Sequence, residues 1–167
     1  MILLEIKRRH DMSKSDVKKL FNSLDTAYDE IPVPPEKGRY MLCETDTDVS
    51  VVTFEGTPSF LLWKDQVIPS LHLFLDLDVR TLANRVIVDM GAISFVTNGA
   101  DIMRPGIVDV SASITENMFV IVGDERHGKP LAIGIALYDG ETIAAMSEGK
   151  AVKNVHYVGD PIWNLKV

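Results

Sequence analysis

The stretch from residue 88 to residue 107, VDMGAISFVTNGADIMRPGI, constrains the fold of this chain more than any other part of it. It joins an apolar strand and a short helix to a turn in which Gly99 and Gly106 bracket Ala-Asp-Ile-Met-Arg-Pro. Glycine allows a left-handed backbone or a close approach to a ligand, and Pro105 fixes its own φ. A turn with so few side chains and with Arg104 beside it predicts a surface for a phosphate group. A tight connection without any ligand fits the same pattern.

The turn also resembles the signature of the PUA domain, the small RNA-binding barrel of pseudouridine synthases and archaeosine transglycosylases. The resemblance rests on Gly99-Ala100 and on the run Met103-Arg104-Pro105-Gly106-Ile107. Two later segments match the same pattern, an apolar strand with a central glycine at residues 131–137 and a closing Gly-Lys-Ala-Val strand at residues 149–152. The resemblance implies RNA contacts around this helix and turn, with backbone groups as donors.

Other segments narrow the resemblance to one family. Residues 154–157 and 160–163, NVHY and DPIW, are similar to the C-terminal domain of the malignant-T-cell-amplified family of translation factors and its standalone archaeal relatives. Residues 8–14 and 66–71 resemble the pre-PUA half of the same proteins. The resemblance therefore extends to both halves of the chain.

The resemblance implies an α+β fold of two parts. A small α/β pre-PUA domain is expected over residues 1–80, followed by a PUA mixed β pseudo-barrel with short helices over residues 85–167. The border is expected within residues 76–84. A length of 167 residues is enough for two small domains of this kind.

Local patterns predict the elements of the first part. Ser13 is typical of a helix N-cap, with Asp16 three residues later, and the apolar residues that follow recur at helical spacing. A strand is expected before this helix, and three strands and a short helix after it. The expected ranges are 4–7, 37–44, 49–54 and 60–63 for the strands and 68–75 for the short helix.

The second part is expected to bury a core of apolar side chains from its strands and short helix. Residues 115–118 depart from the family pattern, which has Gly-Asp at this place. Asn117 can take the left-handed conformation that a glycine would supply. Glu116 makes this rim acidic, which weakens the case for an RNA contact there. The expected core residues are Val86, Ile87, Val88, Ile93, Phe95, Val96, Ile107, Phe119, Val120, Ile121, Ile133, Ile135, Val155 and Trp163.

Charge limits the kind of RNA contact that the chain can make. The formal net charge is −7, and residues 87–167 carry 6 Lys and Arg against 10 Asp and Glu. Tight nonspecific binding to nucleic acid depends on phosphate neutralisation, so we expect weak, structure-specific contact or binding that depends on a partner surface. The local exception is residues 6–19, with 6 Lys and Arg against 2 Asp. These residues form either a basic shoulder for RNA or a solvated face.

No catalytic constellation is visible in the sequence. The four histidines are far apart, Cys43 has no cysteine or histidine neighbour, and no P-loop or nucleophile elbow occurs. His156 is expected to be a half-buried structural residue, and residues 123–130 an exposed hairpin loop. We therefore expect no enzyme activity, no metal site and no cofactor. No apolar run reaches the length of a membrane span, so we expect a cytoplasmic protein without membrane contact.

These observations favour a non-catalytic RNA-binding protein that acts in translation, with tRNA or rRNA as its partner and no role for DNA. The resemblance implies contact with tRNA, the small ribosomal subunit or a translation-factor partner. Two alternatives stay open: a specificity subunit of a tRNA- or rRNA-modifying enzyme, and a protein-interaction module that docks a partner on residues 60–63 and 71–75. The expected RNA-binding residues are Gly99, Ala100, Asp101, Met103, Arg104, Pro105, Gly106, Lys150, Lys153, Arg8, Arg9 and Lys18.

Overall fold

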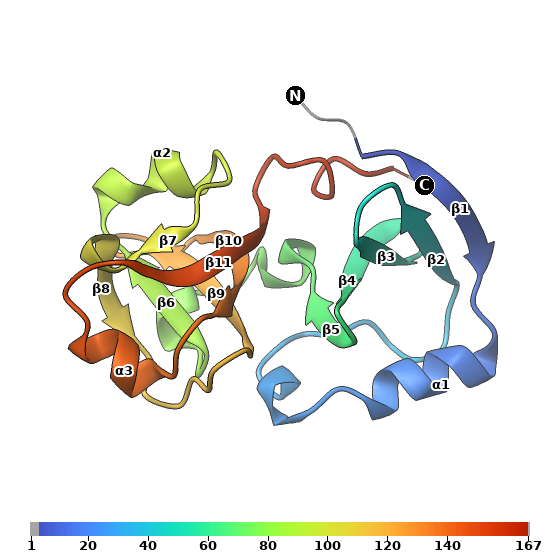
Figure 1. Cartoon of the computed structure of the whole chain (residues 1–167). Coiled ribbons are helices and arrows are strands. Elements are labelled where there is room, and N and C mark those ends of the chain that lie inside the picture. Colours follow the sequence, from blue (N-terminus) through green and yellow to red (C-terminus); the bar gives the residue numbers. More distant parts are fainter. Residues whose placement is uncertain (1–3, 167) are drawn as a thin grey trace. The chain divides into compact units, whose positions relative to one another are not determined.

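The structure is a computed structural model that describes residues 4–166 of the chain (Figure 1). It divides into two compact units. The first unit runs to Leu73 and also includes the segment that begins at Pro161, whereas the second unit spans Phe74–Asp160. Each unit has a β-sheet of its own.

The C-terminal segment packs with the first unit, although the sequence placed it in the second domain. Trp163 stacks on His72, with 4.6 Å between the ring centroids and 21° between the ring planes. The hydroxyl of Ser70 lies 2.9 Å from Nδ1 of His72 and orients that ring. Because Trp163 and His72 are far apart in the sequence, no local pattern indicates their contact.

The first unit is built on a five-stranded antiparallel sheet in the order β1-β2-β3-β4-β5. The expected strands are confirmed as elements, although β2 begins at Tyr40 rather than at residue 37. The short helix expected over residues 68–75 forms only as a 3₁₀ turn at Leu71–Phe74. Its expected beginning is wrong, because Ile68 precedes a proline and so favours extended backbone, and it pairs with β4. The strands are β1 (Ile6–Asp11), β2 (Tyr40–Thr45), β3 (Val49–Phe54), β4 (Thr57–Trp63) and β5 (Gln66–Pro69).

The helix α1 (Lys14–Asn22) begins where the sequence predicted. Ser13 is its N-cap, and its Oγ accepts a hydrogen bond of 3.1 Å from the backbone N–H of Asp16. Val17 and Leu20 are buried on one side of the helix, while the lysines at 14, 18 and 19 are exposed on the other. The amphipathic pattern therefore fixes which side of α1 packs on the sheet.

The second unit is built on a six-stranded mixed sheet in the order β7-β11-β10-β9-β6-β8. β6 and β9 run parallel, and every other neighbouring pair is antiparallel. The sheet curls into a nearly closed pseudo-barrel, as the fold class predicted from the sequence requires. The strands are β6 (Arg85–Val88), β7 (Ile102–Met103), β8 (Ile107–Val110), β9 (Phe119–Asp124), β10 (Pro130–Ala136) and β11 (Lys150–Tyr157).

Short helical segments connect these strands. Two are single α-helical turns or little more, and the others are 3₁₀ turns. The α-helices are α2 (Ile93–Val96) and α3 (Gly140–Ala145). The 3₁₀ turns of the chain are Thr26–Tyr28, Leu71–Phe74, Val79–Thr81, Met90–Ala92 and Arg104–Gly106.

The barrel core contains most of the apolar residues expected there, but Phe95 is a clear exception. Its side chain is 67% exposed, whereas Val96 beside it is buried. On a single helical turn, Ile93 and Val96 lie three residues apart and share the face toward the core, so Phe95 points away from it. Trp163, also expected in this core, belongs to the first unit.

The departure from the family pattern at residues 115–118 does not disrupt the turn. Asn117 has a φ of +70°, so asparagine supplies the left-handed conformation as predicted. Its backbone N–H donates to the carbonyl of Ala136 at 2.8 Å and so closes the turn against the end of β10.

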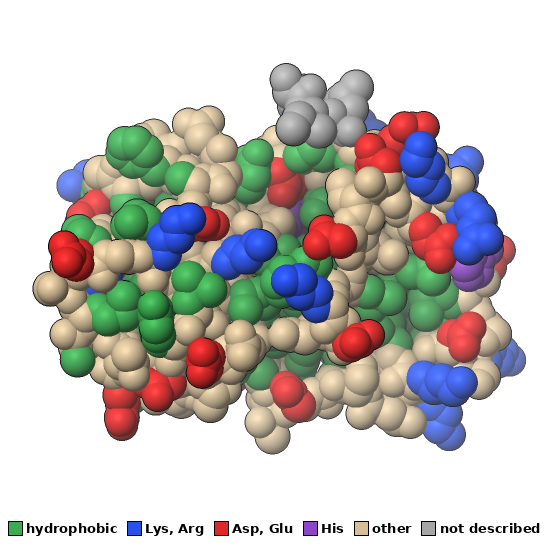
Figure 2. Space-filling view, in the orientation of Figure 1, with side chains coloured by type: hydrophobic (Ala, Val, Ile, Leu, Met, Phe, Trp, Pro, Cys, Tyr) green, Lys and Arg blue, Asp and Glu red, His purple; other side chains and the backbone are tan. Residues whose placement is uncertain are grey.

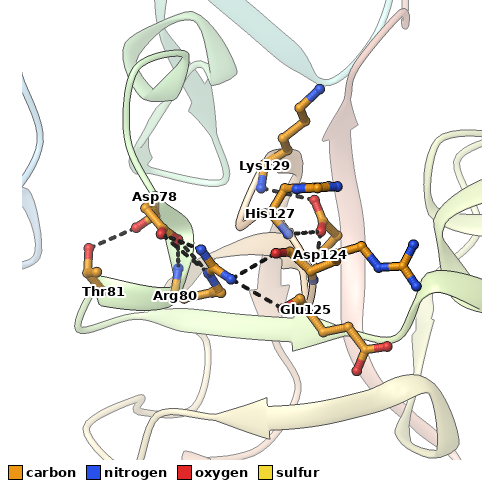
Figure 3. Close-up of polar contacts among 8 residues, drawn as sticks. Asp78, Arg80, Thr81, Asp124, Glu125, His127 and Lys129 are labelled. Carbon is orange, nitrogen blue, oxygen red and sulfur yellow. Dashed lines mark hydrogen bonds and ion pairs between the residues drawn. The ribbon is translucent and has the colours of Figure 1, made fainter.

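A buried carboxylate organises the loop between β9 and β10 (Figure 3). Asp124 is 2% exposed, and its oxygens accept backbone N–H groups from Arg126, His127 and Lys129 at 2.9, 2.6 and 3.0 Å. Burial by itself raises the pKa of Asp124, but the three backbone donors outweigh it and hold the pKa below its ordinary value. The sequence indicated a hairpin loop here, but it gave no sign of this buried anchor.

Arg80 attaches the same loop to the preceding 3₁₀ turn (Figure 3). Its guanidinium donates to the carbonyls of Glu125 and Arg126 at 3.4 and 3.0 Å, and pairs with Asp78 at 2.8 Å. A Cβ on Gly128 would collide with the Asp78 carboxylate, so this close approach requires glycine.

We expect Asp124→Asn to destabilise the second unit. The amide can accept hydrogen bonds through only one atom and places an N–H₂ group against backbone donors, so the free energy of unfolding should fall by roughly 1–3 kcal/mol. Because the folded pKa is lowered, the carboxylate's contribution is full above the ordinary Asp pKa and is lost as pH falls through the folded value. The free energy of unfolding, measured by urea denaturation at a series of acidic pH values, should therefore fall less steeply with decreasing pH in the variant than in the unmodified protein. The same decrease in the free energy of unfolding with falling pH in both proteins would contradict this account.

Candidate nucleic-acid interface

A groove of about 300 Å³ lies on the second unit between the helical segment of residues 90–96 and the turn predicted as the site. Four of the expected RNA-binding residues, Asp101, Met103, Pro105 and Gly106, line it. The remaining lining residues come from the helical segment and from β7. They are Asp89, Gly91, Ala92, Phe95, Val96 and Ile102.

The two glycines of the turn lie close to other side chains of the protein, and Gly106 lines the groove whereas Gly99 does not. Gly99 has a φ of +92°, and a Cβ there would lie 2.9 Å from the Tyr157 ring. A Cβ on Gly106 would lie 3.2 Å from the Cβ of Ala92. The sequence predicted a left-handed turn and a close approach at these glycines, and the structure shows that the close approach is to the protein's own side chains.

Hydrogen bonds and an ion pair attach the turn of residues 99–106 to β11. Oδ1 of Asp101 accepts the backbone N–H of Asn154 at 2.9 Å, and its Oδ2 lies 3.2 Å from Nζ of Lys150. The side-chain N–H₂ of Asn154 donates to the carbonyls of Val96 and Ala100, both at 3.0 Å. Asp101 and Ala100 are therefore held by β11, and Lys150 beside the groove is partly neutralised.

Arg104 turns its guanidinium toward the protein's own carbonyl groups. It donates to the carbonyls of Ile143 at 2.6 Å, Ile107 at 2.9 Å and Ala144 at 3.2 Å. The carbonyls of Ile143 and Ala144 lie in the last turn of α3, where a cation is favourable. Arg104 does not line the groove. We expected it to fork onto a phosphate, but the structure gives it three intramolecular acceptors.

The chemistry of the groove walls suits a nucleobase better than a phosphate. Phe95 is 67% exposed and Met103 46% exposed, so both present apolar surface to solvent. Asp89 and Asp101 are the charged lining residues, and no Lys or Arg is among the described residues that line the groove. Aromatic and apolar faces accept stacked, unpaired bases, whereas two carboxylates repel phosphate. Sequence reasoning placed Phe95 in the core and so missed it, although the three-residue spacing of Ile93 and Val96 indicates which face of this helical turn is buried.

The other expected cations do not form one surface. Lys153 is exposed on β11 and does not line the groove. In the first unit, Arg8 and Arg9 are adjacent on β1 and so point to opposite faces of the sheet. Arg8 pairs with Glu44 at 2.7 Å, and this hydrogen bond lowers the pKa of Glu44. Lys18 lies on a different element, α1.

On the face that Figure 2 shows, acidic and basic side chains are interspersed, and no continuous basic area covers the second unit. This distribution agrees with the net charge of −7. Binding by broad phosphate neutralisation is therefore disfavoured on that face of the second unit.

The described residues show no arrangement typical of an active site. His156 is fully buried rather than half-buried, and its Nδ1 lies 2.8 Å from Oδ2 of Asp160, while its Nε2 has no hydrogen-bond partner. Cys43 is buried, and burial raises the pKa of its thiol. Within residues 4–166, no three His, Cys, Asp or Glu side chains are grouped as a metal site. No helix in the same range is both long and apolar enough to cross a membrane.

Comparison with known sequences agrees with this geometry. The PUA domain model matches residues 84–158, which lie within the second unit. An uncharacterised protein of Methanocaldococcus jannaschii is 43% identical over 98% of this chain and 99% of its own length. Translation machinery-associated protein 20 of Saccharomyces cerevisiae is 29% identical over 92% of this chain and 86% of its own. Human malignant T-cell-amplified sequence 2 is 34% identical over 47% of this chain and 45% of its own.

Comparison with solved structures extends the likeness to the whole chain. A hypothetical protein from the archaeon Pyrococcus horikoshii superimposes with a TM-score of 0.82 and 35% sequence identity. The match covers 96% of this chain and 100% of that one. Both the first unit and the barrel are therefore shared, as the resemblance implied.

We expect Arg104→Ala to lower the stability of the second unit rather than leave the fold unaffected. The substitution leaves three carbonyls without their donor, and the expected loss is roughly 1–3 kcal/mol in the free energy of unfolding by urea. Arg126→Ala is the matched control, because it removes the same charge from an exposed position in the β9–β10 loop. Equal stability of the two variants would show that the Arg104 hydrogen bonds contribute little.

Proposed function

The chain belongs to the family of PUA-domain proteins that includes translation machinery-associated protein 20 and the malignant T-cell-amplified proteins, and from that premise we propose that it contacts tRNA or the small ribosomal subunit. Its family supports RNA binding and a role in translation. We propose further that it binds RNA without catalysing a reaction on it.

The observation that carries this proposal is the exposed pair Phe95 and Met103 beside the groove. Two exposed large apolar side chains that line the same hollow are typical of a ligand-binding groove, and this supports the proposal. An aromatic ring stacks on any unpaired base, and such stacking contributes about 1–3 kcal/mol per base. The groove therefore favours a single-stranded end or a looped-out base over a regular duplex.

The two carboxylates that line the groove also favour a base over a phosphate. Asp89 uses Oδ1 to cap the helical segment by accepting the backbone N–H of Ala92 at 2.9 Å. Asp101 is engaged by Asn154 and Lys150. Two acidic groups at an apolar groove disfavour a phosphate and tolerate the amino edge of a base. We propose that bases, rather than the backbone, enter this groove.

The two other functions suggested by the sequence gain less support. A protein-interaction module needs an exposed docking surface over residues 60–63, but Phe60 and Leu61 are fully buried and Trp63 is 7% exposed. Leu75 is the exposed large apolar residue of the second docking segment, at 55%. A specificity subunit of a modifying enzyme would use the same groove, and identification of the bound RNA would distinguish it from a translation factor.

The proposal predicts that Phe95→Ala and Met103→Ala each weaken RNA binding by about tenfold, through the loss of stacking surface. Binding would be measured by fluorescence anisotropy with labelled unfractionated tRNA and with labelled small-subunit rRNA at one salt concentration. Stability should change little, because Phe95 is largely exposed and Met103 is about half exposed.

Val108→Ala is the matched control. Val108 is an exposed apolar residue of the same unit, at 51%, but it does not line the groove. If all three variants bind RNA as the unmodified protein does, the groove is not the RNA site. If crosslinking in cells recovers neither tRNA nor small-subunit rRNA, the proposed partners are wrong.

A further inference from the structure

We propose that a hollow on the sheet of the first unit binds a phosphate of the RNA backbone, an inference that deepens the proposed function and rests on it. The hollow has a volume of about 400 Å³ and lies where β2 begins and β3 ends. Its lining residues are Arg9, Arg39, Met41, Thr53, Glu55 and Gly56.

The strand register explains why these side chains meet. Met41 lies directly opposite Thr53, and Arg9 lies directly opposite Cys43. Met41 and Cys43 are two residues apart on β2, so they point to the same face of the sheet. Arg9, Met41 and Thr53 therefore share that face, with Arg39 immediately before β2.

The two guanidinium groups are differently engaged. The Arg9 guanidinium makes no ion pair with another described residue, and its side chain is exposed. Nε of Arg39 lies 3.1 Å from Oδ1 of Asp11, and both side chains of this pair are about two-thirds exposed. A solvent-exposed ion pair exchanges readily for another anion. Both guanidinium groups are therefore available to a ligand.

The lining carboxylate does not cancel this charge. Oε1 of Glu55 accepts the backbone N–H of Arg39 at 2.8 Å, which commits that oxygen to the turn between β3 and β4. Two arginines against one glutamate leave the lining residues net positive, in a chain whose net charge is −7. Arginine presents a planar fork that matches two phosphate oxygens.

The hollow is the chemical complement of the groove on the second unit. The groove is lined by two carboxylates, with no Lys or Arg among its described lining residues, whereas the hollow is lined by two guanidinium groups. Arg8, on the other face of β1, is already paired with Glu44. The charges therefore assign base contact to the groove and backbone contact to the hollow.

The first test removes the two arginines. Arg9→Gln/Arg39→Gln should bind labelled unfractionated tRNA at least about tenfold more weakly, because two charge-assisted contacts are lost. The slope of log affinity against log salt should flatten by about one per arginine. Lys64→Gln/Lys166→Gln is the matched control, because it makes the same change in net charge at exposed positions of the same unit that lie outside residues 6–19 and do not line the hollow. A loss no greater than that of the control would overturn the proposal.

The second test predicts a gain, which misfolding cannot produce. Asp11→Asn removes the competitor for Arg39 and should tighten tRNA binding several-fold, whereas Asp29→Asn makes the same charge change at an exposed position away from the hollow. Equal affinities of these two variants would overturn the proposal. If the arginine variant binds normally while Phe95→Ala does not, the hollow fails and the groove stands. If the unmodified protein binds no RNA, both fail together.

Discussion

The groove of the second unit depends on β11, which holds the turn of residues 99–106 by its backbone and by the side chains of Asn154 and Lys150. β7 pairs with β11 through only two residues, so ladder hydrogen bonds alone give this turn little support. Asn154 supplies the rest, because it donates from its backbone to Asp101 and from its side chain to Val96 and Ala100. One residue thus joins α2, the turn and the closing strand. The backbone N–H of Arg104 adds a further bond of 2.8 Å to the carbonyl of Gly149.

This attachment separates the residues of the turn into two kinds. Gly99 and Arg104 lie against the protein, and Asp101 is held by β11 although it also lines the groove; together they define the shape of the turn. Phe95 and Met103 face solvent and define what can bind. Because this loop is already ordered by its contacts with β11, it offers a preformed surface. Binding therefore does not carry the entropic cost of ordering the loop. Weak RNA contact by an acidic protein is physically reasonable on such a surface, since recognition then relies on stacking and shape rather than on net charge.

Local sequence patterns predicted the features that are locally determined. Ser13 caps α1, and both Asn117 and Gly99 have a positive φ, which at Gly99 ends the helical segment. The reason for each lies within a few residues of the sequence. Features that depend on distant partners were not predictable. Arg104 was expected to bind phosphate because its acceptors at Ile143 and Ala144 are remote in the sequence.

The remaining errors have the same physical origin. Asp124 looked like part of an exposed loop, since nothing in the sequence shows that its carboxylate folds back onto three N–H groups of that loop. Phe95 was expected in the core because it is apolar. The direction in which a single helical turn points its side chain was not taken into account. The fold of the barrel was nevertheless predictable, because the resemblance of residues 99–107 to the PUA signature implied it.

The signature glycines are close to other side chains of the protein as well as to the proposed RNA surface, and this limits which substitutions can test the site. A side chain on Gly99 would press on the Tyr157 ring, and one on Gly106 would press on Ala92, whether or not RNA is bound. Loss of binding in such a variant therefore cannot be assigned to the loss of an RNA contact, because the groove itself would change shape. Only side chains that end in solvent separate the two effects. Phe95 and Met103 meet that condition beside the groove, and Arg9 and Arg39 meet it at the hollow of the first unit.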